Sequence, residues 1–426
     1  MEEIRRLKQE ELLDSLTLSE FAFQYVLTEE DKARRIARTD PKQIWGYFVD
    51  GKMAAKLTIL ELQIWLNGKR YAMGGISGVA TWPEYRRKGM VSQLLELSLR
   101  KMKEAGQSVS FLHPFSFSFY RKFGWEMFMD YVQYEIEAGQ LPRFAAKEGS
   151  RVERVALDAE LLHPIYEAYA SRFNGMLVRD RDWWNHRVFK TGSHTAAVYR
   201  NALGELTGYV YYSISNHIFT VHELVFLDED ARCGLWKFIS DHDSMMTTTI
   251  VKAPAQDKLS FLLADPRMKQ ERKPYFMARI VDVEAFISQY SFVAASVITG
   301  NPETHDIPGT PETLMTSMTS MSPRALRVSR PFYLQVSDAY AEWNQGLFEI
   351  IVDVSGEAKV TRQPELQLKE GAELLSCDIQ TLSCLLMGYQ KASFLHTIGR
   401  IQGNQAEVMR LEALIPDCTT YLTDYF

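Results

Sequence analysis

The strongest chemical signal in this sequence is a basic turn between a predicted strand and a predicted helix. Gly75–Thr81 reads as a strand and Met90–Glu104 as an amphipathic helix, with the three cations Arg86–Lys88 and then Gly89 between them. A helix start offers unpaired N–H groups and the positive end of the helix dipole, and glycine lets a ligand approach the backbone. The segment therefore predicts a pyrophosphate site, although basic turns also precede helices that bind no cofactor. Neither G-x-x-x-x-G-K-[ST] nor G-x-G-x-x-G is present in this segment, which excludes P-loop and Rossmann sites there.

A second chemical candidate is the tyrosine inside an aromatic run, His113–Trp125. The pKa of a tyrosine is near 10 and that of a thiol is about 8.5, so Tyr120 is suited to protonate a leaving thiolate. The alternative is that the run, with its four phenylalanines, only packs the core. Composition alone favours the packing interpretation.

Bulk composition sets limits on function. A chain of 426 residues predicts two or three domains, and 46% hydrophobic with 24% charged residues is ordinary for a globular protein. A net charge of −6 argues against a nucleic-acid binder. The four cysteines form no C-x-x-C pair or zinc motif, which predicts no metal. No apolar run approaches the roughly 20 residues of a membrane span, and the charged N-terminus is unlike a signal peptide, so we expect no membrane contact and a cytoplasmic location.

Three segments are expected along the chain: 1–145, 146–285 and 286–426. The first predicts a mixed α/β domain. The second repeats its order of hairpin, strand, turn and helix, but Asp228–Asp230 replaces the cations, and carboxylates repel a pyrophosphate. We interpret it as a degenerate copy that has lost the cofactor. The third is an α+β domain, in which Thr310–Pro323 is predicted to be a loop.

Two motifs in the first segment resemble those of the GNAT acetyltransferases. Arg86, Gly89 and Val91 occupy the defined positions of [RQ]-x-x-G-x-[GA], with Val91 in place of the usual small residue, and Phe119–Trp125 matches F-Y-x-x-x-G-[WFY]. The domain order resembles the Eis (enhanced intracellular survival) group. The resemblance implies α/β and α+β domains: tandem GNAT domains, the second degenerate, followed by a sterol-carrier-like domain.

The resemblance also implies an acetyl-CoA-dependent N-acetyltransferase that acts by direct attack in a ternary complex. The acceptor would be a primary amine such as an aminoglycoside, a polyamine or a lysine, and the assembly a hexamer. Tyr120 would be the proton donor to the thiolate. The residues expected to bind acetyl-CoA are Val79, Ala80 and Thr81 along the pantetheine; Arg87, Lys88, Gly89, Met90, Val91 and Ser92 around the pyrophosphate; and Phe115 and Ser116 beside them.

In this group the third domain supplies a terminal carboxylate to the active site. The sequence here ends in Tyr425 and Phe426, and two aromatic residues at that position indicate docking rather than the commoner frayed tail. The Phe426 carboxylate is thus the expected proton acceptor from the incoming ammonium, directly or through water. The other candidates for the base are His113, which is more simply a buried hydrogen-bonded histidine, a carboxylate near Glu20, and a water chain.

Two functions from different classes follow. The first is the N-acetyltransferase. The second is a non-enzymatic protein that binds CoA or an apolar ligand. The segment Glu20–Tyr25 should lie near the amine, and its aromatic character argues against aminoglycoside specificity.

Overall fold

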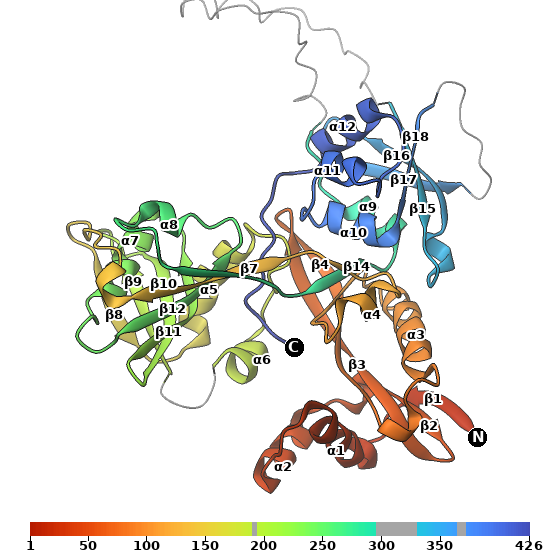
Figure 1. Ribbon diagram of the computed structural model, residues 1–426, viewed down its shortest axis with the longest axis horizontal. Coiled ribbons are helices and arrows are strands. Elements are labelled where there is room, and N and C mark those ends of the chain that lie inside the picture. Colours follow the sequence, from red (N-terminus) through yellow and green to blue (C-terminus); the bar gives the residue numbers. More distant parts are fainter. Residues whose placement is uncertain (190–193, 295–329, 364–371) are drawn as a thin grey trace, which may run out of the picture.

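The computed structural model describes residues 1–189, 194–294, 330–363 and 372–426, and the predicted loop Thr310–Pro323 lies outside these residues. The described chain forms three lobes, each around one β-sheet (Figure 1). Two sheets have seven strands and the third has four. The C-terminal segment leaves the third lobe and ends between the other two (Figure 1).

The first sheet has the order β1-β2-β3-β4-β5-β14-β6. Tight turns with left-handed residues at Asp50-Gly51 and Asn67-Gly68 close its two hairpins, as the sequence predicts. Its strands are β1 Glu2–Arg6, β2 Ile44–Val49, β3 Lys52–Leu66, β4 Lys69–Thr81, β5 Val109–Leu112, β6 Glu126–Met127 and β14 Met277–Ile280. Its helices are α1 Leu12–Phe23, α2 Glu29–Arg38, α3 Met90–Glu104 and α4 Phe117–Arg121.

The second sheet has the order β13-β7-β12-β11-β10-β9-β8. Its strands are β7 Asp130–Glu137, β8 Arg151–Val155, β9 His194–Arg200, β10 Leu206–Ser215, β11 Ile218–Phe226, β12 Thr248–Pro254 and β13 Lys269–Pro274. Its helices are α5 Ala159–Ala170, α6 Arg181–Trp183, α7 Glu229–Ser240 and α8 Leu259–Leu262.

The first two lobes exchange strands. β7 precedes residue 145 but pairs with β12 and β13 of the second sheet, and β14 follows the whole second sheet but pairs with β5 and β6 of the first. The predicted domain boundaries at 145 and 285 therefore do not coincide with the divisions between the sheets. The physical reason is that a strand pairs with whichever edge has open hydrogen-bonding groups, and a short apolar segment carries no signal for one edge over another.

The third lobe is a sheet of order β17-β16-β15-β18 with helices beside it. It comprises β15 Phe332–Ser337, β16 Gly346–Val352, β17 Ala358–Gln363, β18 Leu374–Asp378, α9 Val283–Gln289, α10 Ile379–Leu386, α11 Ala392–Thr397 and α12 Gln405–Leu414. A buried ion pair joins it to the first sheet, because Arg279 on β14 donates to both oxygens of Asp338 at 2.7 and 2.9 Å. An ion pair without solvent access holds the two lobes in one geometry.

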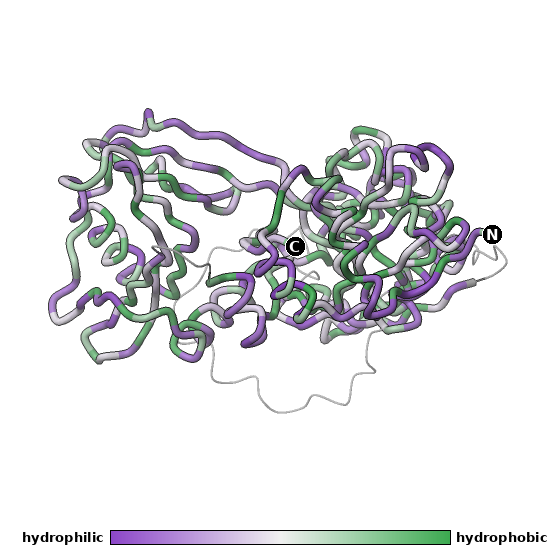
Figure 2. Tube along the Cα trace, turned by 90° about the horizontal axis from the view of Figure 1, so that it is seen from below, coloured by the Kyte–Doolittle hydropathy of each residue, from purple (hydrophilic) through white to green (hydrophobic). Residues whose placement is uncertain are grey.

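Hydrophobic and hydrophilic segments alternate along the chain (Figure 2), and the hydrophobic side chains gather in buried clusters. One large cluster of buried side chains spans all three lobes, so the lobes share part of their core. Among the described residues, no helix combines the length and the apolar character needed to cross a bilayer.

Candidate active site

The site is built where β4 and β5 separate. The two strands pair in parallel from Met73↔Val109 to Ile76↔Leu112 and no further. β4 continues to Thr81, still paired with β3 on its other edge. Within the described chain no strand pairs with the β5-facing edge of 77–81, so its backbone groups are available to a ligand with amide groups. Val79, Ala80 and Thr81, the residues expected along the pantetheine, lie on this open edge.

The basic turn follows β4 directly. Arg87 and Gly89 both adopt left-handed backbone conformations, with φ of 63° and 80°, and α3 starts at Met90 without a side-chain cap. No backbone hydrogen bond among the described residues engages the N–H groups of Arg87, Lys88 or Gly89. The first N–H groups of α3 have no partner inside the helix either. The turn therefore presents a row of donors at the positive end of a helix dipole.

The side chains around this turn supply positive charge. Arg86, Arg87 and Lys88 are exposed, and none of them joins an ion pair within the described residues. The first turn of α3 has no acidic residue. Met90 is different, because its side chain is 4% exposed in the core and only its backbone faces the turn. Unneutralised cations and free N–H groups together fit a pyrophosphate.

The equivalent turn of the second lobe has the opposite character. Asp228 caps α7 by accepting a hydrogen bond from the Ala231 N–H at 2.7 Å, and Glu229 and Asp230 occupy the first turn. A carboxylate thus already holds one of the N–H groups that a phosphate would bind. This geometry agrees with the interpretation of the second lobe as a degenerate copy.

Tyr120 lies on α4, directly after β5. It belongs to the same buried cluster as Met90, against which Val79 and Val91 also pack, so the strand, the helix start and the tyrosine form one unit. The side chain is 3% exposed, and burial raises its pKa above the ordinary value. Its hydroxyl has no hydrogen-bond partner among the described residues. A tyrosine that keeps its proton and has no internal acceptor is suited to donate it.

Phe115 and Ser116 flank this tyrosine. The ring of Phe115 is 72% exposed and lies 5.4 Å from the Tyr120 ring, so an apolar surface extends from the tyrosine toward solvent. Ser116 caps α4 by accepting from the Phe119 N–H at 3.4 Å. The cap fixes the start of the short helix that carries Tyr120.

Phe426 reaches the opposite face of the same strand region. Its ring is 6% exposed and lies 4.9 Å from the Phe276 ring and 6.3 Å from the Trp183 ring. A Cβ atom at Gly75 would come within 2.8 Å of the Phe426 ring, so only glycine admits the ring at that place on β4. Phe426 packs in a different buried cluster from Tyr120, and both adjoin the point where β4 and β5 separate.

A buried charge cluster holds the last residues in place. Asp424 accepts from Arg179 Nε at 3.0 Å and from Trp183 Nε1 at 2.7 Å, and Arg179 Nη1 donates to Glu223 at 3.2 Å. All three charged groups are almost fully buried, and burial raises the pKa of Asp424. Tyr275 also donates to the Asp424 carbonyl at 3.1 Å. The tail is therefore fixed two residues before Phe426, which sequence reasoning did not find, because the partners lie about 150 to 245 positions away.

The two alternative bases have different surroundings. His113 was expected to be buried and hydrogen-bonded, but it is exposed and has no hydrogen bond among the described residues. Its ring lies 5.0 Å from the Tyr425 ring and 5.4 Å from the Tyr275 ring, and desolvation by the surrounding protein lowers its pKa although part of the side chain is exposed. The Glu20 carboxylate accepts from the Leu27 N–H at 2.8 Å and lies 3.6 Å from Lys32 Nζ. The Glu20 carboxylate is thus already engaged at the turn between α1 and α2.

The expected amine side of the site is aromatic. The Phe21 ring on α1 lies 5.0 Å from the ring of Trp82, the residue that follows β4. Phe21 and Phe23 are 50% and 51% exposed. Exposed aromatic rings beside a strand end are a surface for the apolar or cationic part of an acceptor.

A buried lysine beneath this surface gives a testable pH dependence. Lys56 on β3 is 4% exposed and donates to Ser15 Oγ and Ser19 Oγ at 2.7 Å, and no carboxylate of the described residues pairs with it. Burial lowers its pKa to about 8. Below pH 8 the side chain is charged in both the folded and unfolded states, so the burial penalty is fully present. Between pH 8 and about 10.5 only the unfolded state keeps the proton, so stability rises with pH by about 3 kcal/mol.

We expect Lys56→Met to remove this pH dependence. The melting temperature of the wild type should rise relative to that of Lys56→Met between pH 7.5 and pH 10, because only the wild type is relieved of a buried charge. The exposed Lys52→Met on the same strand serves as the control and should follow the wild type. Parallel profiles for Lys56→Met and the wild type would contradict the buried-charge interpretation.

Known families match all three lobes. Residues 3–128 and residues 175–280 each match the acetyltransferase (GNAT) domain, and residues 320–423 match the sterol carrier protein domain. The second match falls on the lobe with the acidic turn, so its fold is that of a GNAT domain. The Eis resemblance is thereby confirmed in domain content and order.

Two curated relatives carry related names. An uncharacterized N-acetyltransferase of Streptomyces griseus is 26% identical over 265 residues, which are 56% of this chain and 64% of that protein. The N-acetyltransferase Eis of Mycobacterium tuberculosis is 27% identical over 225 residues, which are 50% of this chain and 56% of that protein. The chain therefore matches less than two thirds of the length of these relatives.

Solved structures extend the likeness to the whole chain. A probable N-acyltransferase of unknown function from Enterococcus faecalis superposes with a TM-score of 0.84 at 25% identity and covers 100% of both chains. Eis1 from Mycobacterium abscessus superposes with a TM-score of 0.75 at 19% identity, also over 100% of both chains, which shows the shared fold. With two GNAT domains followed by a sterol carrier protein domain in the same arrangement, this chain belongs to the GNAT family in its Eis-like form.

Proposed function

We propose that the protein is an acetyl-CoA-dependent N-acetyltransferase whose first GNAT domain carries the reaction. The observation that carries this proposal is the conjunction of the uncapped, basic start of α3 with the open edge of β4 and the unpartnered Tyr120 hydroxyl. The pyrophosphate would bind the N–H groups and cations of 87–92. The pantetheine amides would pair with 79–81, as an additional strand does at an open sheet edge.

The proposed reaction is a direct transfer in a ternary complex. The amine nitrogen attacks the acetyl carbonyl carbon, a C–N bond forms, and the C–S bond breaks to release the CoA thiolate. Tyr120 gives its proton to the thiolate sulfur. The Phe426 carboxylate, at the end of this sequence, takes a proton from the attacking ammonium, directly or through water. Holding both reactants together supplies a large part of the rate gain.

The acceptor class is a primary amine. Exposed Phe21 and Phe23 support an acceptor with an apolar or flat part beside its amine rather than a polyhydroxylated one. We propose a screen of polyamines, arylalkylamines, lysine peptides and aminoglycosides for release of free CoA. Release with arylalkylamines and little with aminoglycosides would agree with the aromatic surface.

The competing proposal is a protein that binds CoA or an apolar ligand without catalysis. Its third lobe has an apolar cavity of only about 20 Å³, lined by side chains such as Phe292, Phe332 and Leu386. That volume is close to one water molecule, which does not favour a lipid in this conformation. Acetyl-CoA binding with no amine-dependent CoA release across the whole panel would favour the binding protein.

One prediction tests the site of acetyl-CoA directly. We expect calorimetry to give one site per chain, because the α7 turn is already capped by Asp228. Arg87→Glu should weaken binding by about 10-fold or more, since a charge-assisted contact to phosphate contributes roughly 1.5–3 kcal/mol. Arg100→Glu, further along the exposed side of α3, is the matched control and should bind as the wild type does. Two equivalent sites per chain would contradict the assignment to the first domain.

A further inference from the structure

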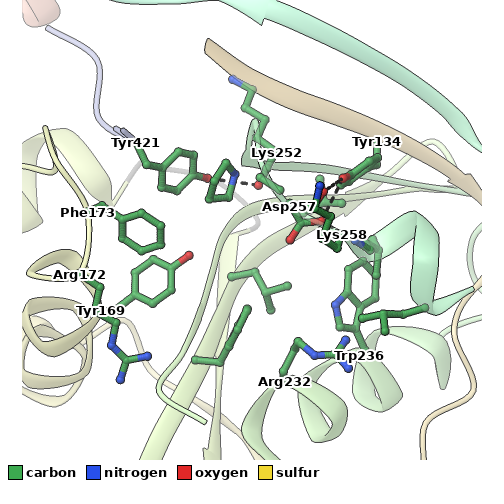
Figure 3. A pocket seen from close by; sticks show the side chains of 17 residues that line it. Tyr134, Tyr169, Arg172, Phe173, Arg232, Trp236, Lys252, Asp257, Lys258 and Tyr421 are labelled. Atoms are coloured by element: carbon green, nitrogen blue, oxygen red, sulfur yellow. Dashed lines mark hydrogen bonds between the residues drawn. The ribbon is translucent and has the colours of Figure 1, made fainter. Parts of the chain in front are cut away.

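The second lobe contains a cavity at the place that corresponds to the site of the first. β11 and β12 pair in parallel from Ile218↔Thr248 to Val221↔Val251, after which β11 continues to Phe226 without that partner. A cavity of about 340 Å³ lies at this divergence, between the two strands, α5 and α7 (Figure 3). This volume is in the range of small-molecule sites.

Acetyl-CoA does not fit here by the mode used in the first lobe. The start of α7 is occupied by the Asp228 carboxylate, and Glu229 and Asp230 add negative charge where a pyrophosphate would lie. In the second lobe, the start of α7 is therefore unsuited to a phosphate, but the space between the diverging strands remains. A retained space with altered chemistry is a site for a different ligand.

Six of the 17 residues that line the cavity are aromatic. Tyr134 comes from β7, Tyr169 from α5, and Trp236 from α7, with Tyr421 of the C-terminal segment opposite (Figure 3). Tyr169 is 6% exposed, and no hydrogen bond of its hydroxyl is present among the described residues. Such walls hold a flat, apolar molecule by its faces and leave a donor for a polar group.

The charged residues of the wall are unbalanced. Three cationic side chains line the cavity against one carboxylate, Asp257, which already accepts from the Tyr134 hydroxyl at 3.0 Å and the Leu259 N–H at 2.8 Å. They are Arg172, Arg232 and Lys258, whereas the Lys252 side chain points away from the cavity, with its Nζ 4.9 Å from the Tyr131 ring (Figure 3). The excess positive charge favours a ligand with an anionic group.

Arg232 provides the most specific observation. It is 9% exposed, and Glu229 accepts from its Nε at 2.8 Å and also from its Nη2. Its Nη1 is buried and has no hydrogen-bond partner. A buried guanidinium nitrogen without an acceptor is costly, since such groups are almost always paired. Arg232 lines the cavity, but Nη1 itself has almost no accessible surface, so a carboxylate in the cavity would satisfy it after a small shift of the side chain.

We propose that the diverging strands of the second GNAT domain form a binding site for a small aromatic carboxylic acid, with the rings of Trp236, Tyr169 and Tyr421 around its body and Arg232 on its carboxylate. The site is distinct from the cleft of the first domain. Its wall includes Tyr421, whose hydroxyl donates to the Lys252 carbonyl at 3.3 Å, so the segment that ends at Phe426 also closes this cavity.

The experiment uses the full chain and two probes of nearly equal shape, indole-3-acetate and its uncharged amide. Calorimetry should show that the acid binds at least about 10-fold more tightly than the amide, because only the acid pairs with Arg232. Arg232→Gln should remove that preference. Lys237→Gln, an exposed cation on the same helix and outside the cavity wall, is the matched control and should keep it.

A second variant keeps the test decisive if Arg232→Gln does not fold. Ala253→Phe adds a ring inside the cavity and should abolish binding of the acid, while acetyl-CoA binding to the first domain serves as the folding control. Equal affinity for acid and amide, full binding by Ala253→Phe, or displacement of the acid by acetyl-CoA would each overturn the proposal. None of these measurements needs catalysis, so the proposal can fail or stand independently of the acetyltransferase function.

Discussion

Tyr120→Phe is expected to lower amine acetylation by roughly 10²–10⁴-fold while acetyl-CoA affinity stays within a factor of about two. General acid catalysis is typically worth this much, and the substitution removes one hydroxyl while it keeps the ring. The ring packs 5.1 Å from Phe119 and 6.4 Å from Trp125, so its place in the core is unchanged. Turnover is measured by release of free CoA, and affinity by calorimetry.

The control for this experiment is Tyr71→Phe. Tyr71 is equally buried, lies on β4 and also has a hydroxyl without a partner, but it packs in the other cluster. Its substitution should leave turnover unchanged. Because burial raises the pKa of Tyr120, the wild-type rate should show no loss of this acid as the pH rises toward 9. Wild-type turnover by Tyr120→Phe, with chemistry rate-limiting, would exclude Tyr120 as the acid.

Residues appended after Phe426 are expected to abolish most amine acetylation and to leave acetyl-CoA binding intact. An extension converts the proposed base into an amide and adds bulk beside a ring that is 6% exposed. Deletion of Phe426 moves the carboxylate back by up to about 3.5 Å and empties the space beside Gly75. Rates are compared for the extended, the deleted and the unmodified chain under saturating acetyl-CoA.

The same extension at the N-terminus is the control, since β1 lies at the far edge of the first sheet. Asp424→Ala adds a second test, because it keeps the terminal carboxylate but removes its buried anchor to Arg179. It should raise the KM for the amine more than that for acetyl-CoA. A C-terminally extended chain that acetylates amines at the unmodified rate would exclude the carboxylate and leave His113 or a water chain as the base.

The sequence by itself determined those features that depend on residues close together in the chain, such as helix starts and caps. The helix Met90–Glu104 was predicted with the bounds that the structure has, because glycine and the cations before it mark a start and its apolar residues recur at helical spacing. The acidic, capped start of α7 could be predicted from Asp228–Asp230, since a capping carboxylate acts on the N–H groups of the next turn. The roles proposed for Tyr120 and Phe426 came from the resemblance to a known family, because composition alone left them open.

Only the tertiary structure decided what depends on contacts between distant segments. The exchange of β7 and β14, the anchoring of Asp424 by Arg179 and the aromatic cavity of the second lobe each join residues more than 100 positions apart. The sequence predicts a helix over Leu16–Leu27, but the structure has it over Leu12–Phe23. It ends earlier because Gln24 adopts a left-handed conformation and the Glu20 carboxylate accepts from the Leu27 N–H. Such arrangements follow from open sheet edges and buried charges that must find partners, and the identity of each partner is set by the fold rather than by its neighbours in sequence.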